Sequence, residues 1–146
     1  MPMRLRLISS VILVAVFGAL ALTFGTAAAR PSPSISAVSS QRLAEAGITL
    51  AAPAPTEQAI ISPATAERLG ALQGGLGGRT PVRQAVLARV IHSDPPIDRL
   101  CWVVSLDPTG WFHAHGPKSS PNRHVAAFFL VYLDAHTGQW IFSQAG

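Results

Sequence analysis

His113 and His115 are the residues whose types and spacing most suggest chemistry, because imidazole is a common ligand of zinc. In an extended chain, a spacing of two residues directs both rings to one side. A metal site usually adds a carboxylate or a third histidine nearby, and the nearest acid, Asp107, lies beyond a proline and a glycine. Further imidazoles could come from His92, His124 and His136. The pattern therefore favours histidines on a surface loop over a metal site.

Hydrolysis by a serine would need a nucleophile, a base and an orienting acid. Ser105, Ser119 and Ser120 could each be combined with a histidine and an aspartate, but the chain has no Gly-x-Ser-x-Gly, His-Glu-x-x-His or phosphate-binding glycine motif. We therefore expect no enzyme activity, no catalytic residue and no cofactor. The alternative is a minimal metal-dependent or serine hydrolase that uses His113 and His115.

Cys101 is the only cysteine, so the chain forms no intramolecular disulfide and no cluster of thiolate ligands. Its neighbours Leu100 and Trp102 are apolar. This setting is typical of an inert buried thiol and not of a nucleophile.

Trp111 and Phe112 form an aromatic pair in a segment that prolines and glycines on both sides mark as a loop. Loops are usually exposed, so we interpret the pair as a contact surface for a protein partner. The alternative is a lid that folds over the edge of the sheet and belongs to the core.

The elements that would position these residues lie in the C-terminal half. Thr80-Pro81 is typical of a helix start, and Val82, Ala85, Val86 and Val90 follow at helical spacing. We therefore expect the main helix over residues 81–92, ending before two prolines. A shorter helix is expected from Pro63 to Gly70, with Ser62 as its cap.

Three strands are expected after the main helix. The first covers residues 100–106, with its bulky even-numbered residues facing the helix. The second covers residues 125–134 and is apolar on both faces, which indicates a central strand, and the third covers residues 139–143. The predicted fold class is therefore α+β, with one main helix packed on a small antiparallel sheet of about three strands.

A tight turn is expected between the second and third strands. The Asp134 carboxylate can accept backbone amides, Thr137 follows, and Gly138 can adopt a positive φ without steric cost.

The segment Val131-Tyr132-Leu133-Asp134-Ala135-His136-Thr137-Gly138-Gln139 resembles the closing hairpin of the PepSY family of small extracytoplasmic domains. The expected helix with Gln84-Ala85 and the strand Trp102 to Leu106 stand in that family's order, so the resemblance covers about residues 80–146. The long segment 107–124 departs from the family's short connection. The resemblance implies a non-catalytic module that binds or regulates an envelope protein such as a peptidase.

The N-terminus resembles a secretory signal. Arg4 and Arg6 precede an apolar run that spans residues 7–24, and Ala27 to Ala29 fit a signal peptidase site. Cleavage after Ala29 would release an extracytoplasmic protein. Alternatively, residues 7–24 remain as an anchor in the cytoplasmic membrane, with the C-terminal part outside.

Between the signal, residues 1–29, and the α+β domain, residues 63–146, we expect a linker over residues 30–62. Proline, serine and alanine dominate this stretch, which favours a semi-extended spacer. Residues 41–47 could form one or two turns of helix.

The charge pattern argues against nucleic-acid binding. Beyond the signal, the chain carries nine basic and seven acidic residues, and the arginines are scattered singly. The predicted function is therefore a non-catalytic extracytoplasmic binding or peptidase-regulating module. Another alternative is a membrane-tethered structural protein without a defined ligand.

Overall fold

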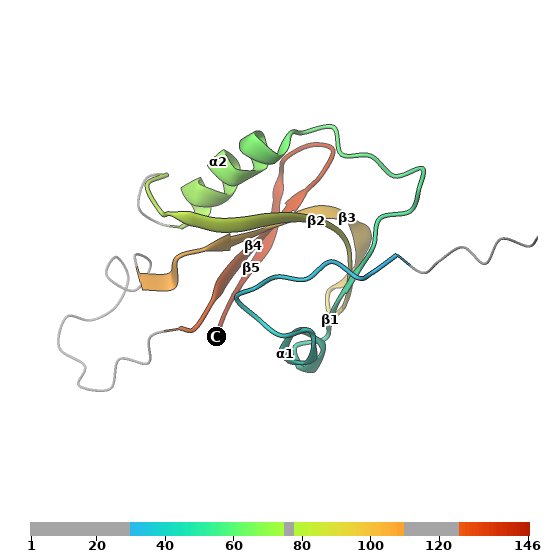
Figure 1. Ribbon diagram of the computed structural model, residues 1–146, viewed down its shortest axis with the longest axis horizontal. Helices are drawn as coiled ribbons and strands as arrows, with labels where there is room; N and C mark the ends of the chain where they lie inside the picture. Colours follow the sequence, from blue (N-terminus) through green and yellow to red (C-terminus); the bar gives the residue numbers. More distant parts are fainter. Residues whose placement is uncertain (1–29, 75–77, 110–125) are drawn as a thin grey trace, which may run out of the picture.

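The computed structural model describes residues 30–74, 78–109 and 126–146. Five strands form a single antiparallel sheet in which each strand pairs with the next along the chain (Figure 1). In chain order, the elements are α1 (Ser40–Glu45), β1 (Ile48–Ala51), α2 (Pro63–Gln73), β2 (Val82–Ser93), β3 (Pro96–Leu106), β4 (Phe129–Asp134) and β5 (Trp140–Ala145).

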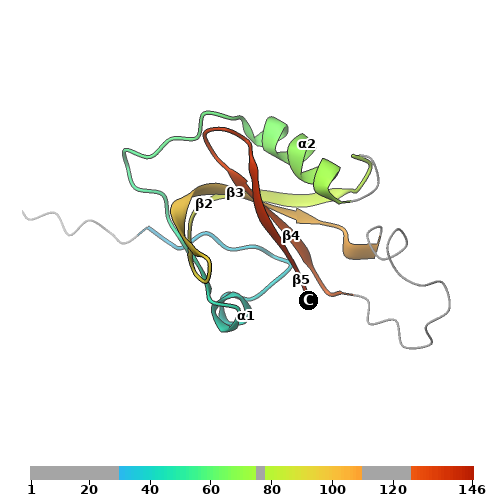
Figure 2. The same ribbon diagram turned by 180° about the vertical axis from the view of Figure 1, so that it is seen from behind.

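The two helices lie on opposite sides of this sheet, as both views show (Figures 1 and 2). We call the sheet surface that packs against α2 the α2 face, and the opposite surface the α1 face. Alternation along β3 divides the core between them, because successive side chains of a strand point to opposite faces. Trp102 and Val104 belong to the α2 face, whereas Cys101 and Val103 belong to the α1 face.

Helix α2 begins where the sequence indicates a cap. The Ser62 hydroxyl accepts a hydrogen bond from the Thr65 amide at 3.2 Å, and Pro63 occupies the first turn. The helix continues past Gly70 because this residue faces the sheet: a Cβ atom there would lie 2.8 Å from Cγ1 of Val104. Glycine at this position therefore permits a close approach of helix and sheet and does not end the helix.

The segment that we expected to be a spacer contributes to the core of the α1 face. Five apolar side chains from it are at most 8% exposed: Ile35, Val38, Leu43, Ile48 and Leu50. They pack against Val90 of β2 and Val103 of β3. Proline, serine and alanine dominate the composition of residues 30–62, so an average over this stretch does not reveal these few aliphatic residues.

The prediction of a main helix over residues 81–92 is wrong, and with it the prediction of a helix on about three strands. This segment is strand β2, which pairs with β1 and β3. Ala88 and Val90 pack on the α1 face, while Ala85 and Leu87 pack on the α2 face. An apolar run covered on both sides is typical of a central strand, and its valines fit helical spacing only by coincidence.

Prolines 95 and 96, which we expected to end that helix, instead lie in a hairpin. Ser93 pairs with Pro96, so a turn of two residues joins β2 to β3. The even-numbered residues of β3 do face a helix, as the sequence indicates, but that helix is α2.

The connection between β4 and β5 is a tight turn. The Asp134 Oδ1 atom accepts hydrogen bonds from the amides of His136 and Thr137, both at 2.9 Å. The Gly138 amide donates to the Asp134 carbonyl at 2.8 Å, and Gly138 has a φ of 74°. A residue with a Cβ atom would be strained at this φ and would meet Leu69 of α2.

The sheet curves around its α1 face. The His92 ring of β2 stacks on Phe142 of β5 with 5.4 Å between ring centroids, and Phe142 stacks on Tyr132 of β4 at 4.1 Å. Two strands separate β2 from β5, and in a flat sheet neighbouring strands lie about 4.8 Å apart. The contact therefore requires the sheet to bend, which makes the α1 face concave.

Candidate functional site

Most of the residues that the sequence singles out for chemistry lie outside the described residues. These are the aromatic pair Trp111 and Phe112, the histidines His113, His115 and His124, and the serines Ser119 and Ser120. The predicted partner surface therefore stays a prediction, and so does the expectation that His113 and His115 lie on a surface loop and form no metal site. Within the three described ranges, no group of three or more histidine, cysteine, aspartate or glutamate side chains could hold a metal ion.

Cys101 is fully buried at the centre of β3. Burial raises the pKa of its thiol to about 12, and the nearby Asp134 carboxylate adds to this shift. The thiol is therefore protonated at neutral pH and is not available as a nucleophile. This agrees with the interpretation of Cys101 as a buried structural residue.

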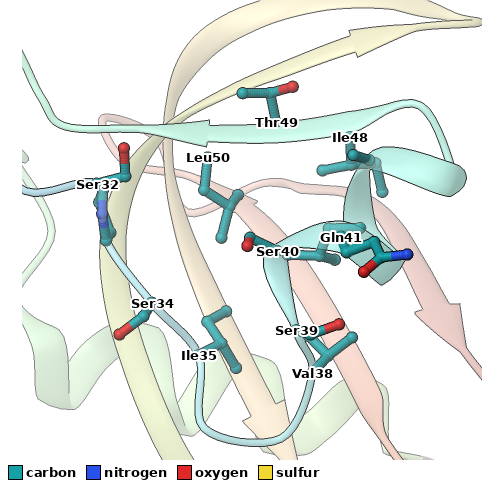
Figure 3. Close-up of a pocket in the computed structure, with 13 residues that line it drawn as sticks. Ser32, Ser34, Ile35, Val38, Ser39, Ser40, Gln41, Ile48, Thr49 and Leu50 are labelled. Carbon is teal, nitrogen blue, oxygen red and sulfur yellow. The ribbon is translucent and has the colours of Figure 1, made fainter.

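A groove lies between the N-terminal segment and β1. It has a volume of about 720 Å³, and Figure 3 shows the residues around it. Segment 32–35 forms one side of this groove, α1 the second and β1 the third. Its thirteen lining residues are Ser32, Pro33, Ser34, Ile35, Val38, Ser39, Ser40, Gln41, Leu43, Ala44, Ile48, Thr49 and Leu50.

The groove has an apolar floor and a hydroxyl-bearing rim. The floor consists of the five apolar residues from segment 35–50 that complete the core of the α1 face. In Figure 3, Leu50 points from β1 into the groove and Thr49 points to the other side of the strand. Four exposed serines, at positions 32, 34, 39 and 40, supply hydroxyl groups around the floor.

The lining of the groove combines apolar side chains with hydroxyl and amide groups. None of the thirteen side chains is ionisable near neutral pH, so the lining supplies no general acid, no general base and no metal ligand. One serine is already used locally, since Ser39 Oγ caps α1 by accepting from the Arg42 amide at 3.2 Å. The remaining hydroxyls have no base to activate them, but they can form hydrogen bonds with a ligand.

One wall of the groove is held by a side chain from the sheet. Gln84 of β2 accepts a hydrogen bond from the Ser36 amide at 2.9 Å and donates to the Ser34 carbonyl at 3.3 Å. Both ends of the Gln84 amide therefore bind the backbone of the N-terminal segment. These two bonds, together with the burial of Ile35 and Val38, keep the segment on the α1 face.

The groove is also bounded by an edge strand. In the described ranges β1 pairs with β2 alone, so its other edge has no neighbouring strand. Unpaired backbone groups at such an edge can accept an additional strand. Strand β1 has no charged residue and no proline, which are the features that usually protect an edge.

Sequence reasoning missed this site because it placed the segment in a spacer. The available signal was the set of large aliphatic residues at positions 35, 38, 43, 48 and 50, in a stretch otherwise composed of small and polar residues. No motif marks the groove, because its chemistry depends on backbone and hydroxyl groups and not on a reactive constellation.

Comparison with known proteins adds no assignment. The chain matches no family model, no curated protein and no solved structure. Nothing in these comparisons bears on the resemblance to PepSY domains, which remains a prediction. Among the described residues, no helix is long and apolar enough to span a membrane; the expected signal or anchor at residues 1–29 lies outside them.

Proposed function

We propose that the protein is a non-catalytic binding module that acts outside the cytoplasmic membrane and binds an uncharged, extended segment of a partner polypeptide in the groove. The observation that carries this proposal is the groove lining, which combines an apolar floor with hydroxyl groups and contains no ionisable side chain. Such a lining can bind and orient a ligand, and it offers no group that would transform one.

The shape of the site favours an extended ligand. Strand β1 forms one side of the groove and its outer edge is free of strand partners in the described ranges. A polypeptide laid along this edge would gain backbone hydrogen bonds, while alternate side chains could contact the apolar floor. The serines of the opposite side could bind its remaining backbone groups.

The composition of the site favours an uncharged ligand. A charged side chain buried over Ile35, Leu43 and Leu50 would lose its hydration and find no opposite charge among the lining residues. Aliphatic and small polar side chains would bury apolar area without this cost.

The location outside the membrane is supported by the signal-like N-terminus, residues 1–29. The resemblance of residues 80–146 to PepSY domains suggests an envelope protein, such as a peptidase, as the source of the bound segment. Inhibition of such a peptidase would follow if the bound segment included its active region.

The proposal can be tested with fluorescent peptides of about eight residues and the purified protein. Uncharged peptides rich in valine, isoleucine, serine and threonine should bind, and the same peptides with a central Asp or Lys should bind at least tenfold more weakly, about 1.4 kcal/mol. The double variant Ser32→Glu and Ser34→Glu should reduce binding to a similar extent, because it adds charge to the exposed rim.

Thr56→Glu provides a matched control, since Thr56 is also an exposed hydroxyl residue in a connecting segment but does not line the groove. It should bind peptide as the unchanged protein does. The groove would not be the peptide site if charged and uncharged peptides bound with equal affinity. The same would follow if Thr56→Glu and the double serine variant lost peptide affinity equally.

A further inference from the structure

A second cavity lies where the N-terminal segment crosses the start of β2 and the end of β3. It has a volume of about 210 Å³ and is lined by Ser36, Ala37, Arg83, Gln84 and Ser105. At about 30 Å³ for each water molecule, this space could hold several waters or one small organic group. It is separate from the groove, with which it shares no lining residue.

Ser105 provides an unused hydrogen-bonding group at this cavity. Its side chain is fully buried, and its Oγ atom has no hydrogen-bond partner in the described ranges. Buried hydroxyls are normally satisfied, because leaving one unpaired costs free energy. Thr80 also has an unpaired buried hydroxyl, but it borders neither cavity and packs against Gly74 instead. Ser105 is therefore the unpaired group that a molecule in the cavity could satisfy.

Arg83 lies at an irregularity of the sheet and places a positive charge at the same cavity. The register between β2 and β3 shifts between Val82 and Gln84, so that Arg83 has no residue opposite it on β3. Such bulges redirect a side chain out of the regular alternation. Here Arg83 lines the same cavity as Gln84 and Ser105, although in a regular strand Arg83 and Gln84 would point to opposite faces.

The Arg83 guanidinium retains free donors. Its described ion pair is a single contact of 3.4 Å with Asp107 Oδ2, and the side chain is 45% exposed. Asp107 does not depend on this contact, because its Oδ1 atom accepts from the amide and the hydroxyl of Thr109 at 2.9 and 2.6 Å. A guanidinium carries five N–H donors, so most of them remain available to a ligand.

We propose that this cavity binds a carboxylate, with Arg83 as its cationic partner and Ser105 Oγ as a buried donor. Gln84 forms the wall, because both ends of its amide are already bonded to the N-terminal segment. The guanidinium can only donate hydrogen bonds and the Ser105 hydroxyl can donate one, and a planar carboxylate matches the fork of a guanidinium. A single arginine beside Asp107 suits a monoanion better than a phosphate dianion, which would be repelled by that carboxylate.

The test is a nuclear magnetic resonance titration of the isotope-labelled protein with sodium acetate and sodium propionate at constant ionic strength. Saturable shifts are expected at the amides of Ser36, Gln84 and Ser105. Acetamide, which has the same shape but no charge, should produce no saturable shifts. Arg83→Gln should weaken binding about tenfold or more, because it removes a charge-assisted hydrogen bond.

Two further variants separate binding from folding. Ser105→Ala should fold normally, since it removes an unpaired buried hydroxyl, and should bind acetate several-fold more weakly. Arg99→Gln is the control, because Arg99 is an exposed arginine in a similar 3.3 Å contact with Asp134, away from this cavity. It should bind acetate as the unchanged protein does.

Peptides with free or amidated C-termini identify the source of the carboxylate. Tighter binding of free C-termini than of propionate would indicate a chain end, and the reverse would indicate a small organic acid. Equal shifts with acetate and acetamide, or acetate binding unaffected by both Arg83→Gln and Ser105→Ala, would overturn the proposal and leave ordered water as the content of the cavity. Neither result depends on peptide binding in the groove.

Discussion

The two faces of the sheet are covered in different ways. On the α2 face, Gly70 allows helix and strand to touch, and the Trp102 indole donates a hydrogen bond of 3.2 Å to the Ile61 carbonyl. On the α1 face, the covering segment is held at intervals by single aliphatic side chains and leaves a groove of about 720 Å³. The α2 face is therefore the more closely covered of the two, whereas the α1 face keeps an open groove beside its core.

The turn between β4 and β5 belongs to the closely packed side. The Ala135 carbonyl accepts hydrogen bonds from the amides of Ile60 and Ile61, and the Ala135 amide donates to the Leu100 carbonyl. Gly138 lies against Leu69 of α2. The turn, the connection before α2 and the helix itself are therefore packed as one unit against the α2 face.

The largest expected difference between the two faces concerns the removal of leucine side chains. Leu106→Ala, on the α2 face, should lower the free energy of unfolding by about 3–4 kcal/mol, because close packing prevents collapse around the cavity. Leu50→Ala, beside the groove, should cost about 2 kcal/mol, because its surroundings are already open to solvent. Chemical denaturation measures both, and Leu72→Ala, at a half-exposed position, is the control. If Leu106→Ala and Leu50→Ala lowered the free energy of unfolding equally, the two faces would not differ in packing as proposed.

A smaller effect is expected from adding a side chain at the closest contact of the α2 face. Gly70→Val should destabilise the protein by about 2 kcal/mol, because its Cβ would overlap Val104 and force helix and sheet apart. Ala64→Val places the same side chain at an exposed position of the same helix and should cost about 0.5 kcal/mol. Thermal unfolding of both variants provides the measurement. If they melt at the same temperature, α2 is not packed as closely as the structure shows.

The smallest effect concerns pH. Burial opposes ionisation of Asp134, but hydrogen bonds from the amides of Thr137 and His136 outweigh it and lower the pKa of this carboxyl. A lowered pKa in the folded state means that Asp134 stabilises the fold above about pH 4, the ordinary range of aspartate, and loses this contribution as the pH falls. Asp134→Asn should therefore flatten the loss of stability below pH 4, measured by denaturation at several pH values.

The groove offers a contrast to this pH dependence, because its lining has no ionisable side chain. Peptide affinity should stay constant over the range in which the protein remains folded. If Asp134→Asn changed the pH dependence of peptide affinity as well as that of stability, the groove on the α1 face and the turn on the α2 face would be energetically coupled.

Sequence reasoning succeeded where one strong local rule applied and failed where two rules competed. Strand β3 and the Asp134 turn follow from alternation and from turn chemistry alone. Segment 82–93 satisfied helical spacing and strand composition together, and only its pairing with β1 and β3 decided between them. Such pairing depends on distant residues, which no local window contains.

The candidate site was harder to foresee for a related reason. The groove exists because segment 32–50 folds back across the α1 face, and that path depends on the bend of the sheet and on Gln84, which is about fifty residues away in the chain. Residues selected for their reactivity led to the histidine and aromatic segment, which lies outside the described ranges. A groove with an apolar floor and a hydroxyl-bearing rim has no comparable signature in the sequence.

The order of the strands has a consequence for how the molecule opens. Since every strand pairs only with its neighbours along the chain, the four residues of β1 can leave the sheet without disturbing the pairing of β2 to β5. Helix α1 and the N-terminal segment would leave with them, and these are the parts that enclose the groove. Such an opening would leave four of the five strands paired, and its cost would be set by the exposure of the five buried aliphatic side chains of this unit. A ligand that binds in the proposed groove would stabilise this unit, because the groove exists only while the unit is assembled.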